Sequence, residues 1–155
     1  MGIEIERKFT IKNDSWRNNV QSSQRLVQGY LAGNKRSSIR VRIEGEKANL
    51  NIKSATLGIS RQEYEYSIPL ADATTMLDNL CEKPVIDKVR HIVVFDNKKW
   101  EIDEFSGENE GLIVAEIELD DENEVIKLPE WANEDVSHDT RYYNVCLVKN
   151  PYKNW

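Results

Sequence analysis

Charged residues in this chain recur in pairs spaced two apart, within one run of alternating polar and apolar residues after another. In the first such run, Glu4 and Glu6 alternate with Ile3 and Ile5. Because successive side chains of a β-strand point to opposite faces, a strand of this kind has one charged face and one apolar face. The polar members of the seven runs are Glu4, Glu6 and Lys8; Arg40 and Arg42; Asn51 and Lys53; Glu63 and Glu65; Lys88 and Arg90; Glu101 and Asp103; Glu116 and Glu118. The chain is therefore expected to consist mainly of amphipathic strands.

About eight segments follow this alternation and are predicted to be strands. They are residues 2–11, 24–32, 37–44, 47–54, 59–68, 86–96, 99–105 and 112–119. Turn-forming sequences such as Glu44-Gly45-Glu46 and Asp96-Asn97-Lys98 lie between consecutive segments, which favours antiparallel neighbours. Helices are predicted over residues 14–23, 71–81 and 136–148, with a further short helix over residues 120–127.

Paired like charges on one face are uncommon on a sheet that simply meets solvent. Two neighbouring carboxylates raise each other's pKa unless a cation lies between them, and two neighbouring guanidinium groups attract an anion in the same way. Any single strand of this type is compatible with an ordinary solvated face. Repetition of the pattern favours a closed barrel with the charged face inward, metal ions and an anion in its lumen, and helices over its apolar outer face.

Charge and length limit the partners and the organisation of such a barrel. The net charge of −6 argues against non-specific binding of duplex nucleic acid, which requires a basic face. The sequence contains neither a signal-peptide pattern nor an apolar run long enough to span a bilayer, so a cytoplasmic protein without membrane contact is expected. We expect residues 1–155 to form a single domain, because one hydrophobic core serves a chain of this size, and a homodimer is expected from the prevalence of dimers.

The run Glu4-Ile5-Glu6-Arg7-Lys8 is an E-x-E-x-K motif that resembles the signature of the CYTH superfamily, also called triphosphate tunnel metalloenzymes. The motifs that follow stand in the order that is typical of this family. They are Gln28-Gly29-Tyr30, Arg40-x-Arg42, Lys53, Glu63-x-Glu65, Lys88-x-Arg90, Glu101-x-Asp103, Glu116-x-Glu118 and Arg141-Tyr142. The resemblance covers nearly the whole chain and is greatest to the compact bacterial inorganic triphosphatases.

The resemblance implies a mainly β fold of the α+β kind: a closed, eight-stranded antiparallel barrel with covering helices that include a C-terminal helix. It also implies Mg²⁺ or Mn²⁺ as cofactor and hydrolysis of a small molecule, inorganic triphosphate, to pyrophosphate and phosphate. Carried over residue by residue, the metal ligands are Glu4, Glu6, Glu116 and Glu118. The residues that hold phosphate oxygens are Lys8, Arg40, Arg42, Lys53, Arg90 and Arg141. The further acids of the lumen, which ligate a second metal, orient water or pair with basic groups, are Glu63, Glu65, Glu101 and Asp103.

Catalysis at such a site depends mainly on positioning and on electrostatic stabilisation of the phosphate chain. Lys88 is a candidate general base, because positive neighbours such as Arg90 favour loss of its proton. Its partner Tyr30 is carried over from the lysine and tyrosine that are thought to act together in the compact triphosphatases. Water activated by the metal and oriented by a glutamate is an equally weighted alternative.

Two other classes of function are compatible with the sequence. Class IV adenylyl cyclases and thiamine triphosphatases use the same scaffold, but they must also hold a nucleoside or a thiazolium group, and this short chain has no obvious extra segment for one. A non-catalytic module that binds polyphosphate or the 5′-triphosphate of RNA is the other alternative. The carboxylate pairs argue against it, because so many acids serve the binding of an anion poorly.

Overall fold

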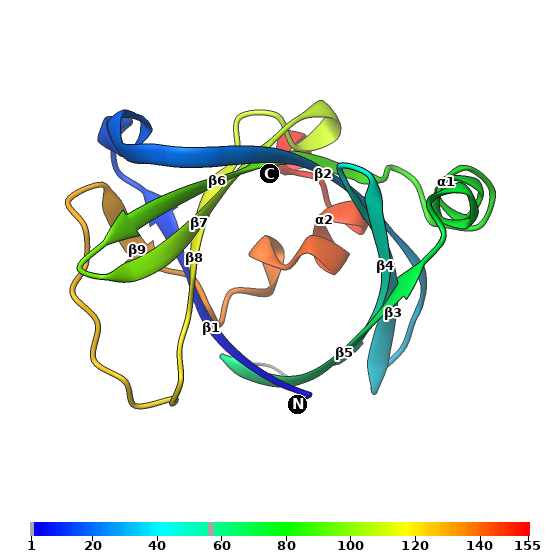
Figure 1. Cartoon of the computed structure of the whole chain (residues 1–155), viewed down its shortest axis with the longest axis horizontal. Coiled ribbons are helices and arrows are strands. Elements are labelled where there is room, and N and C mark those ends of the chain that lie inside the picture. Colours follow the sequence, from blue (N-terminus) through cyan, green and yellow to red (C-terminus); the bar gives the residue numbers. More distant parts are fainter. Residues whose placement is uncertain (1, 56–57) are drawn as a thin grey trace.

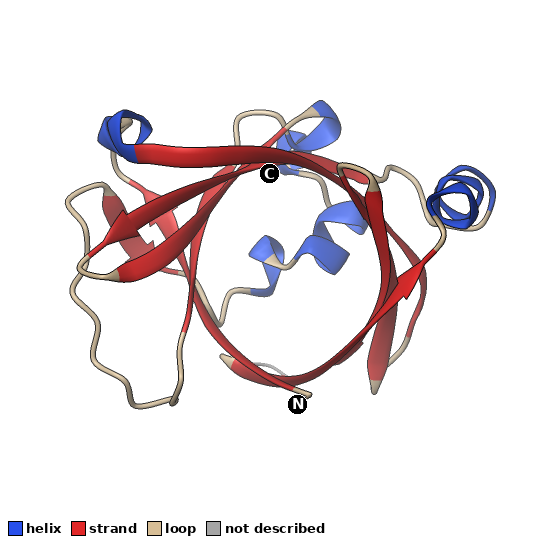
Figure 2. Cartoon of the chain, viewed as in Figure 1, coloured by secondary structure: helices blue, strands red, loops and turns tan. Residues whose placement is uncertain are grey.

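The computed structural model describes residues 2–55 and 58–155, and its strands form a closed antiparallel barrel (Figure 1). The strands are β1 (Ile3–Ile11), β2 (Val20–Gly33), β3 (Ser37–Glu44), β4 (Lys47–Ser54), β5 (Ser60–Ile68), β6 (Ile86–Phe95), β7 (Lys98–Phe105), β8 (Ile113–Glu118) and β9 (Ala132–Asp135). The α-helices are α1 (Leu70–Asn79) and α2 (Asn144–Lys149). Short 3-10 helices are η1 (Ser15–Asn19), η2 (Gly107–Asn109), η3 (Thr140–Tyr142) and η4 (Tyr152–Asn154). Figure 2 shows how strongly strands dominate the described chain.

The barrel closes because β1 pairs with strands on both of its sides. The order around the ring is β1, β5, β4, β3, β2, β6, β7 and β8, and β8 returns to β1. All of these pairs are antiparallel. β9 pairs with the far end of β1 and lies outside the ring. The expected closed, eight-stranded antiparallel barrel is therefore confirmed.

Tight turns help to set the register of the strands. At the turn between β6 and β7, Asp96 and Asn97 have φ values of 53° and 59°, and Asn and Asp tolerate this left-handed conformation better than other residues with side chains. Gly45, in the turn between β3 and β4, has a φ of 61°. These are the turns expected from the sequence, and β3 and β4 have the predicted bounds.

The buried apolar residues form three clusters, two on the outer face of the barrel and one inside it at the end that α2 closes. One cluster gathers under η1 and the segment that leads to β9, and it contains Phe9, Trp16, Val93, Trp100, Ile102, Ala115, Ile117, Leu119, Trp131 and Ala132. α1 covers β3 and β4 from outside through Ala73 and Leu77 (Figure 1). α2 packs Leu147 and Val148 against Ile86, which lies on the same inner face of β6 as Lys88 and Arg90. The rest of the inner face is left to the lumen.

Replacing Trp100 with alanine is expected to lower the free energy of unfolding by about 3–5 kcal/mol. The side chain is fully buried, and its ring centroid lies 5.5 Å from that of Phe9 and 5.3 Å from that of Trp131. Truncation would leave a cavity between β7 and its cover. Trp155→Ala, at a residue that is 38% exposed, is the control and is expected to cost less. Urea unfolding of both variants measures the difference, and equal losses would contradict the place of Trp100 in the core.

Two predicted helices are wrong. A helix was expected over residues 14–23, but only Ser15–Asn19 are helical, as the 3-10 helix η1, and β2 begins at Val20. The reason is that Val20 is already paired with Val93 of β6, so the sheet overrides the local helical pattern. Residues 120–127 form no helix in the described chain; the side chain of Asp121 instead accepts a hydrogen bond from the backbone N–H of Asn123, which favours a turn.

The C-terminal helix is shorter than expected, because only Asn144–Lys149 are α-helical within the predicted range of residues 136–148. Asp139 accepts a hydrogen bond from the backbone N–H of Arg141 and so caps η3 as a separate turn. β9 was not predicted, because a four-residue strand that depends on pairing with β1 has too little alternation of its own.

Among the described residues, no helix combines the length and the apolar character needed to cross a membrane. The cytoplasmic location and the homodimer stay predictions.

Candidate active site

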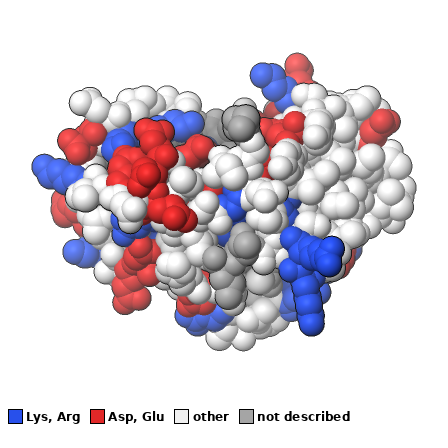
Figure 3. Space-filling view, turned by 90° about the horizontal axis from the view of Figure 1, so that it is seen from below, with Lys and Arg blue, Asp and Glu red and all other residues white. Residues whose placement is uncertain are grey.

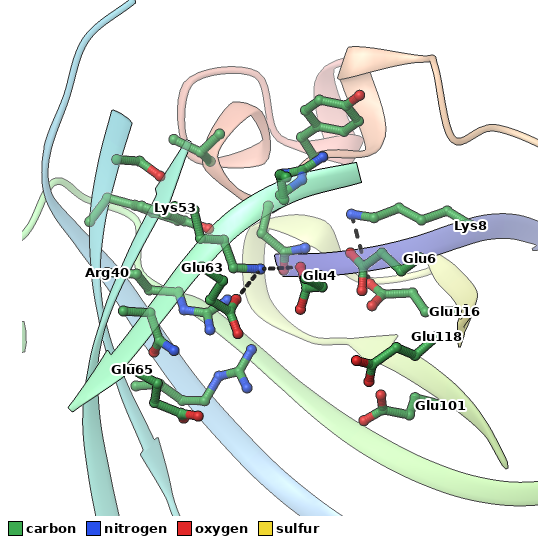
Figure 4. A pocket seen from close by; sticks show the side chains of 18 of the residues that line it. Glu4, Glu6, Lys8, Arg40, Lys53, Glu63, Glu65, Glu101, Glu116 and Glu118 are labelled. Carbon is green, nitrogen blue, oxygen red and sulfur yellow. Dashed lines mark hydrogen bonds and ion pairs between the residues drawn. The ribbon is translucent and has the colours of Figure 1, made fainter. Parts of the chain in front are cut away.

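The charged faces of the strands meet inside the barrel in one polar pocket (Figure 4). The start of α2 lies across one end of it, since Tyr143, Asn144 and Val145 belong to its lining. The other lining residues are Glu4, Glu6, Lys8, Tyr30, Ser38, Arg40, Arg42, Asn51, Lys53, Arg61, Glu63, Glu65, Lys88, Arg90, Glu101, Glu116 and Glu118. The structure thus brings together predicted site residues from strands throughout the sequence.

Most of the acids of this pocket gather on one side, and most of its unpaired basic groups gather on the other. The acidic side consists of Glu4, Glu6, Glu101, Glu116 and Glu118, which come from the adjoining strands β1, β7 and β8. Register sets Glu6 opposite Glu118 and Glu101 opposite Glu116. The basic side consists of Arg40, Arg42 and Lys53, from β3 and β4, together with Arg61 from β5, and it also holds two acids of β5, Glu63 and Glu65. Figure 4 shows Arg40 and Lys53 on one side of the pocket, and Glu116, Glu118 and Glu101 on the other.

Two carboxyls of the acidic side, those of Glu6 and Glu118, have raised pKa values. Burial and the neighbouring Glu116 and Glu4 raise the pKa of Glu6 to about 8. The pKa of Glu118 is also raised, by burial and by the charges of Glu4 and Glu101. Lys8 offsets part of this repulsion, because its Nζ lies 3.7 Å from Oε1 of Glu116. Clustered carboxylate oxygens of this kind fit a hard divalent cation such as Mg²⁺ or Mn²⁺.

The carboxylates of the acidic side do not form a complete coordination shell for a metal ion. No group of three or more His, Cys, Asp or Glu side chains in residues 2–55 and 58–155 is already gathered closely enough to hold a metal ion. Mg²⁺ typically binds through one or two carboxylates and completes its shell with water and with phosphate oxygens of the substrate. The acidic side therefore suits a metal that is bound together with a phosphate chain.

The basic side carries buried donors that lack partners in the described protein. Asn51 is fully buried, and neither polar atom of its side chain has a hydrogen-bond partner. The Nε atoms of Arg40 and Arg61 are likewise buried and unpaired. An unsatisfied buried polar group costs about 1–3 kcal/mol. Donors left in this state, next to paired arginines, indicate a ligand that supplies several acceptor oxygens.

Lys53 connects the two sides. Its Nζ lies 3.3 Å from Oε1 of Glu4 and 2.9 Å from Oε2 of Glu63 (Figure 4). Lys53 lowers the pKa of Glu63, although burial of that carboxyl acts in the opposite direction. Glu63 is thus one of the acids that pair with a basic group.

Lys88 is almost completely enclosed, with 1% of its surface exposed. Its Nζ donates to Oδ2 of Asp103 at 2.7 Å and to Oδ1 of Asn144 at 3.0 Å. The guanidinium of Arg90 forms a fork on the same Asp103, with both nitrogens 2.8 Å from its oxygens. Asp103 is accordingly a buried counter-ion for two cations and does not line the pocket.

The pKa of Lys88 is lowered to about 7. Burial is the largest cause, the charge of Asp103 opposes it, and the positive charge of Arg90 adds to it. The positive neighbours, which the sequence reveals, lower this pKa less than burial does, and only the fold creates the burial. Within the described chain no hydrogen bond joins Lys88 to Tyr30, although both residues line the same pocket.

Arg141 is not brought into the pocket, contrary to the expectation from the sequence. Its Nη2 lies 2.7 Å from Oδ2 of Asp139, and its guanidinium lies over the rings of Tyr142 and Trp155. With 55% of its side chain exposed, it belongs to the surface at η3. The physical reason is that Asp139 caps η3 and holds the arginine beside it.

Sequence reasoning missed several residues of the pocket. Arg61 had a usable signal, because it alternates with Glu63 and Glu65 on β5. Asn51 appeared in the charged-face pattern but received no role. Tyr143 and Asn144 gave no sequence signal, because only the docking of α2 carries them to the lumen.

Charges on the outside are arranged differently. On the face seen in Figure 3, acidic and basic side chains lie interspersed, with the acidic ones most numerous on one half. Exposed charges of both signs are typical of a soluble surface. The crowding of carboxylates on one side is thus a feature of the pocket that this outer face does not share.

Comparisons with known proteins agree with this geometry. Residues 2–143 match the model of the CYTH domain. An inorganic triphosphatase of Acetivibrio thermocellus is 50% identical over 155 residues, which are 100% of this chain and 99% of that protein. An inorganic triphosphatase of Nitrosomonas europaea is 32% identical over 149 residues, which cover 94% of this chain and 96% of that protein.

Solved structures show the same fold. The crystal structure of the inorganic triphosphatase NE1496 superposes with a TM-score of 0.66 and 29% identity, and the match covers 94% of this chain and 93% of that one. The family model spans most of the chain, and a relative with half of its residues identical spans all of it. The resemblance of the charged motifs is confirmed, and the chain belongs to the CYTH domain family.

Proposed function

We propose that this protein hydrolyses inorganic triphosphate to pyrophosphate and phosphate inside the barrel, with a divalent metal ion on the acidic side. The observation that carries the proposal is the make-up of one pocket: crowded carboxylates from β1, β7 and β8, and buried donors without partners from β3, β4 and β5. A phosphate chain with a bound cation satisfies both sides at once. The names of the two curated relatives support the same substrate. In this proposal residues 1–155 act as a single domain.

The acidic side would hold the metal through Glu4, Glu6, Glu116 and Glu118. When bound, Mg²⁺ or Mn²⁺ neutralises charge on the phosphate chain and polarises its oxygens. Two of these carboxyls have raised pKa values, so a bound cation would relieve the repulsion between them and their acidic neighbours. Glu101 lines the same side and is a further candidate, and Glu65 faces it from β5.

The basic side would hold the phosphate oxygens. Arg40 and Arg42 follow each other on the inner face of β3, and burial together with the charge of Arg40 lowers the pKa of Arg42 to about 10. Arg42 is therefore still charged at neutral pH, and an anion between the two guanidinium groups would stabilise both. Arginine suits this task because its planar fork binds phosphate bidentately. Lys8, Lys53, Arg61, Arg90 and the amide of Asn51 complete the donor set.

Lys88 would accept the proton of the attacking water. Its amine is buried at the edge of the pocket, with a pKa close to neutrality, and a general base works best when its pKa lies near the operating pH. Asp103 would stabilise the ammonium that forms, because it already accepts a hydrogen bond from Nζ. Tyr30, which lines the pocket near Lys8 and Arg42, is proposed to orient the reacting phosphate.

A second candidate function is hydrolysis of an organic triphosphate, and one observation favours it. The charged pocket has a volume of about 110 Å³, which is small beside the roughly 300–1,000 Å³ of pockets for drug-sized ligands. A cavity of about 340 Å³ adjoins it and shares Tyr30, Arg61 and Tyr143. Ala32, Val145 and Cys146 give this cavity an apolar lining, so it offers room for a base or a thiazolium ring.

The experiment is phosphate release from inorganic triphosphate, ATP, thiamine triphosphate and pyrophosphate, each with Mg²⁺, with Mn²⁺ and with a chelator. Release that depends on metal and is confined to inorganic triphosphate is expected. Faster release from ATP or thiamine triphosphate would transfer the function to the second candidate. Tight binding of triphosphate without release would reject both and leave a binding module.

Arg61→Ala is expected to raise KM for inorganic triphosphate about 10- to 100-fold, because one charge-assisted contact contributes roughly 1.5–3 kcal/mol. Arg61 lines the pocket with a buried, unpaired Nε. Arg141→Ala is the matched control, since Arg141 lies at the surface with Asp139, and its KM is expected to stay within about twofold. Steady-state kinetics of both variants make the comparison, and the opposite order of effects would reject the placement of these two arginines.

A further inference from the structure

Asn144, the first residue of α2, reaches Lys88 from the end of the barrel. Its Oδ1 accepts a hydrogen bond from Nζ of Lys88 at 3.0 Å and another from Nε2 of Gln28 at 3.2 Å. Gln28 is fully buried on β2, and its Oε1 accepts from Nε of Arg42 at 3.1 Å. One chain of hydrogen bonds therefore runs from Asp103 through Lys88, Asn144 and Gln28 to Arg42.

The direction of this chain follows from the chemistry of its last member. The guanidinium of Arg42 has only donors, so it requires the oxygen of the Gln28 amide. The nitrogen of Gln28 must then be the donor to Asn144, which sets the oxygen of the Asn144 amide toward both Gln28 and Lys88. Asn144 thus offers Lys88 an acceptor and cannot donate to it through the same atom.

This arrangement decides where the free electron pair of Lys88 points. A neutral amine has two N–H groups and one lone pair. Oδ2 of Asp103 and Oδ1 of Asn144 take the two hydrogens, at 2.7 Å and 3.0 Å. The ring of Phe105, 5.4 Å from Nζ, lies against the amine as well. The direction that remains is the pocket, which Lys88 lines.

We propose that Asn144 is a positioning residue that holds the amine of Lys88 with its lone pair directed into the pocket. The inference rests on the proposed function, in which Lys88 is the base. It gives α2 a second role besides covering one end of the barrel (Figure 1), because this helix supplies one of the two acceptors that orient the base.

The amide has an advantage over a carboxylate at this position. The charged groups around Lys88 are Asp103 of β7, Arg90 of β6, Glu116 of β8 and Arg42 of β3. Asp103 alone among them accepts a hydrogen bond from Nζ within the described chain. Asn144 adds a second acceptor without a second negative charge, so the amine is oriented while its proton stays easy to remove.

The test compares Asn144→Ala, Asn144→Asp and the control Asn154→Asp, which places the same new charge on an exposed residue of η4. Initial rates with inorganic triphosphate, measured from about pH 5 to pH 10, give kcat, KM and the pH profile of each. Titration of the lysine side chains by NMR, with Lys88→Arg used to assign the signal, reports on the amine without any activity.

Asn144→Ala is expected to lower kcat about 10- to 100-fold while KM changes less than about threefold, because orientation of the base matters only in the reacting state. Asn144→Asp keeps the acceptor but adds charge. Its acidic limb and the NMR titration of Lys88 are expected to move up by about one pH unit or more, with kcat recovering at high pH. Asn154→Asp is expected to behave like the unmodified protein.

The outcomes separate this inference from the proposed function. An active protein in which all three variants keep the kcat and the pH profile of the unmodified protein would overturn the positioning role alone. Equal loss in Asn144→Ala and Asn144→Asp at every pH, with no shift in the Lys88 signal, would also overturn it and leave Asn144 a structural anchor of α2. Absence of triphosphate hydrolysis in the unmodified protein would overturn the proposed function and this inference with it.

Discussion

Lys88→Ala is expected to reduce kcat for inorganic triphosphate by about 10²- to 10⁴-fold, which is the usual contribution of a general base. In the unmodified protein, the rate should rise with pH through about 7, the pKa of Lys88. The sign follows from the role: the amine accepts a proton only when it is neutral, and it is neutral only above its pKa. The variant should lose this limb of the pH profile.

Two further variants separate the loss of the base from other effects. Lys88→Arg keeps a positive charge beside Asp103 but cannot deprotonate near neutral pH, so it is expected to be about as inactive as Lys88→Ala. Lys47→Ala removes an exposed lysine at the turn between β3 and β4 and should leave the profile unchanged. An unaltered profile in Lys88→Ala would assign the activation of water to the metal instead of Lys88.

Glu4→Gln/Glu6→Gln is the second change with a large expected effect, a loss of about 10²- to 10³-fold in metal-dependent hydrolysis. The size follows from the several kcal/mol that a metal contributes to charge stabilisation, at a factor of ten per 1.36 kcal/mol. Folding should survive, because the pKa of Glu6, raised to about 8, leaves this carboxyl largely neutral near pH 7, and Lys53 keeps Glu63 as a partner when Glu4 is changed. A glutamine side chain has nearly the same shape as the neutral carboxyl of Glu6.

The measurement is phosphate release as a function of Mg²⁺ and Mn²⁺ concentration, beside thermal unfolding with and without metal. Glu44→Gln/Glu46→Gln is the matched control, since these residues are the same pair of acids with the same spacing on an exposed turn. It should behave as the unmodified protein does. Full metal-dependent activity in Glu4→Gln/Glu6→Gln would remove β1 from the metal site.

The alternation of the sequence predicted the barrel strands well, because a period of two is a property of each strand by itself. The segments 37–44 and 47–54 coincide with β3 and β4. The local helical patterns predicted the helices less reliably than alternation predicted the strands. The helix predicted over residues 14–23 is wrong because the pairing of Val20 with Val93 outweighs the local helix propensity. β9 was not predicted because it depends on pairing with β1, which precedes it by more than a hundred residues.

The residues of the candidate site were likewise predicted only in part. Alternation and motif order were enough to name Glu4, Glu6, Arg40 and Arg42, which all line the pocket. They were not enough to exclude Arg141 from the site, because the position of its side chain depends on the turn that Asp139 caps.

The sequence by itself determined which face of each strand is charged, since that depends only on the chemistry of alternate residues. Only the tertiary structure decided the partners and the proton affinity of those charges. Burial brings the pKa of Lys88 close to neutrality, closure sets the acids of β1 beside those of β8, and docking of α2 places Asn144 on the amine. Each of these depends on distance and desolvation across elements far apart in the chain, and neither quantity is defined until the barrel has closed.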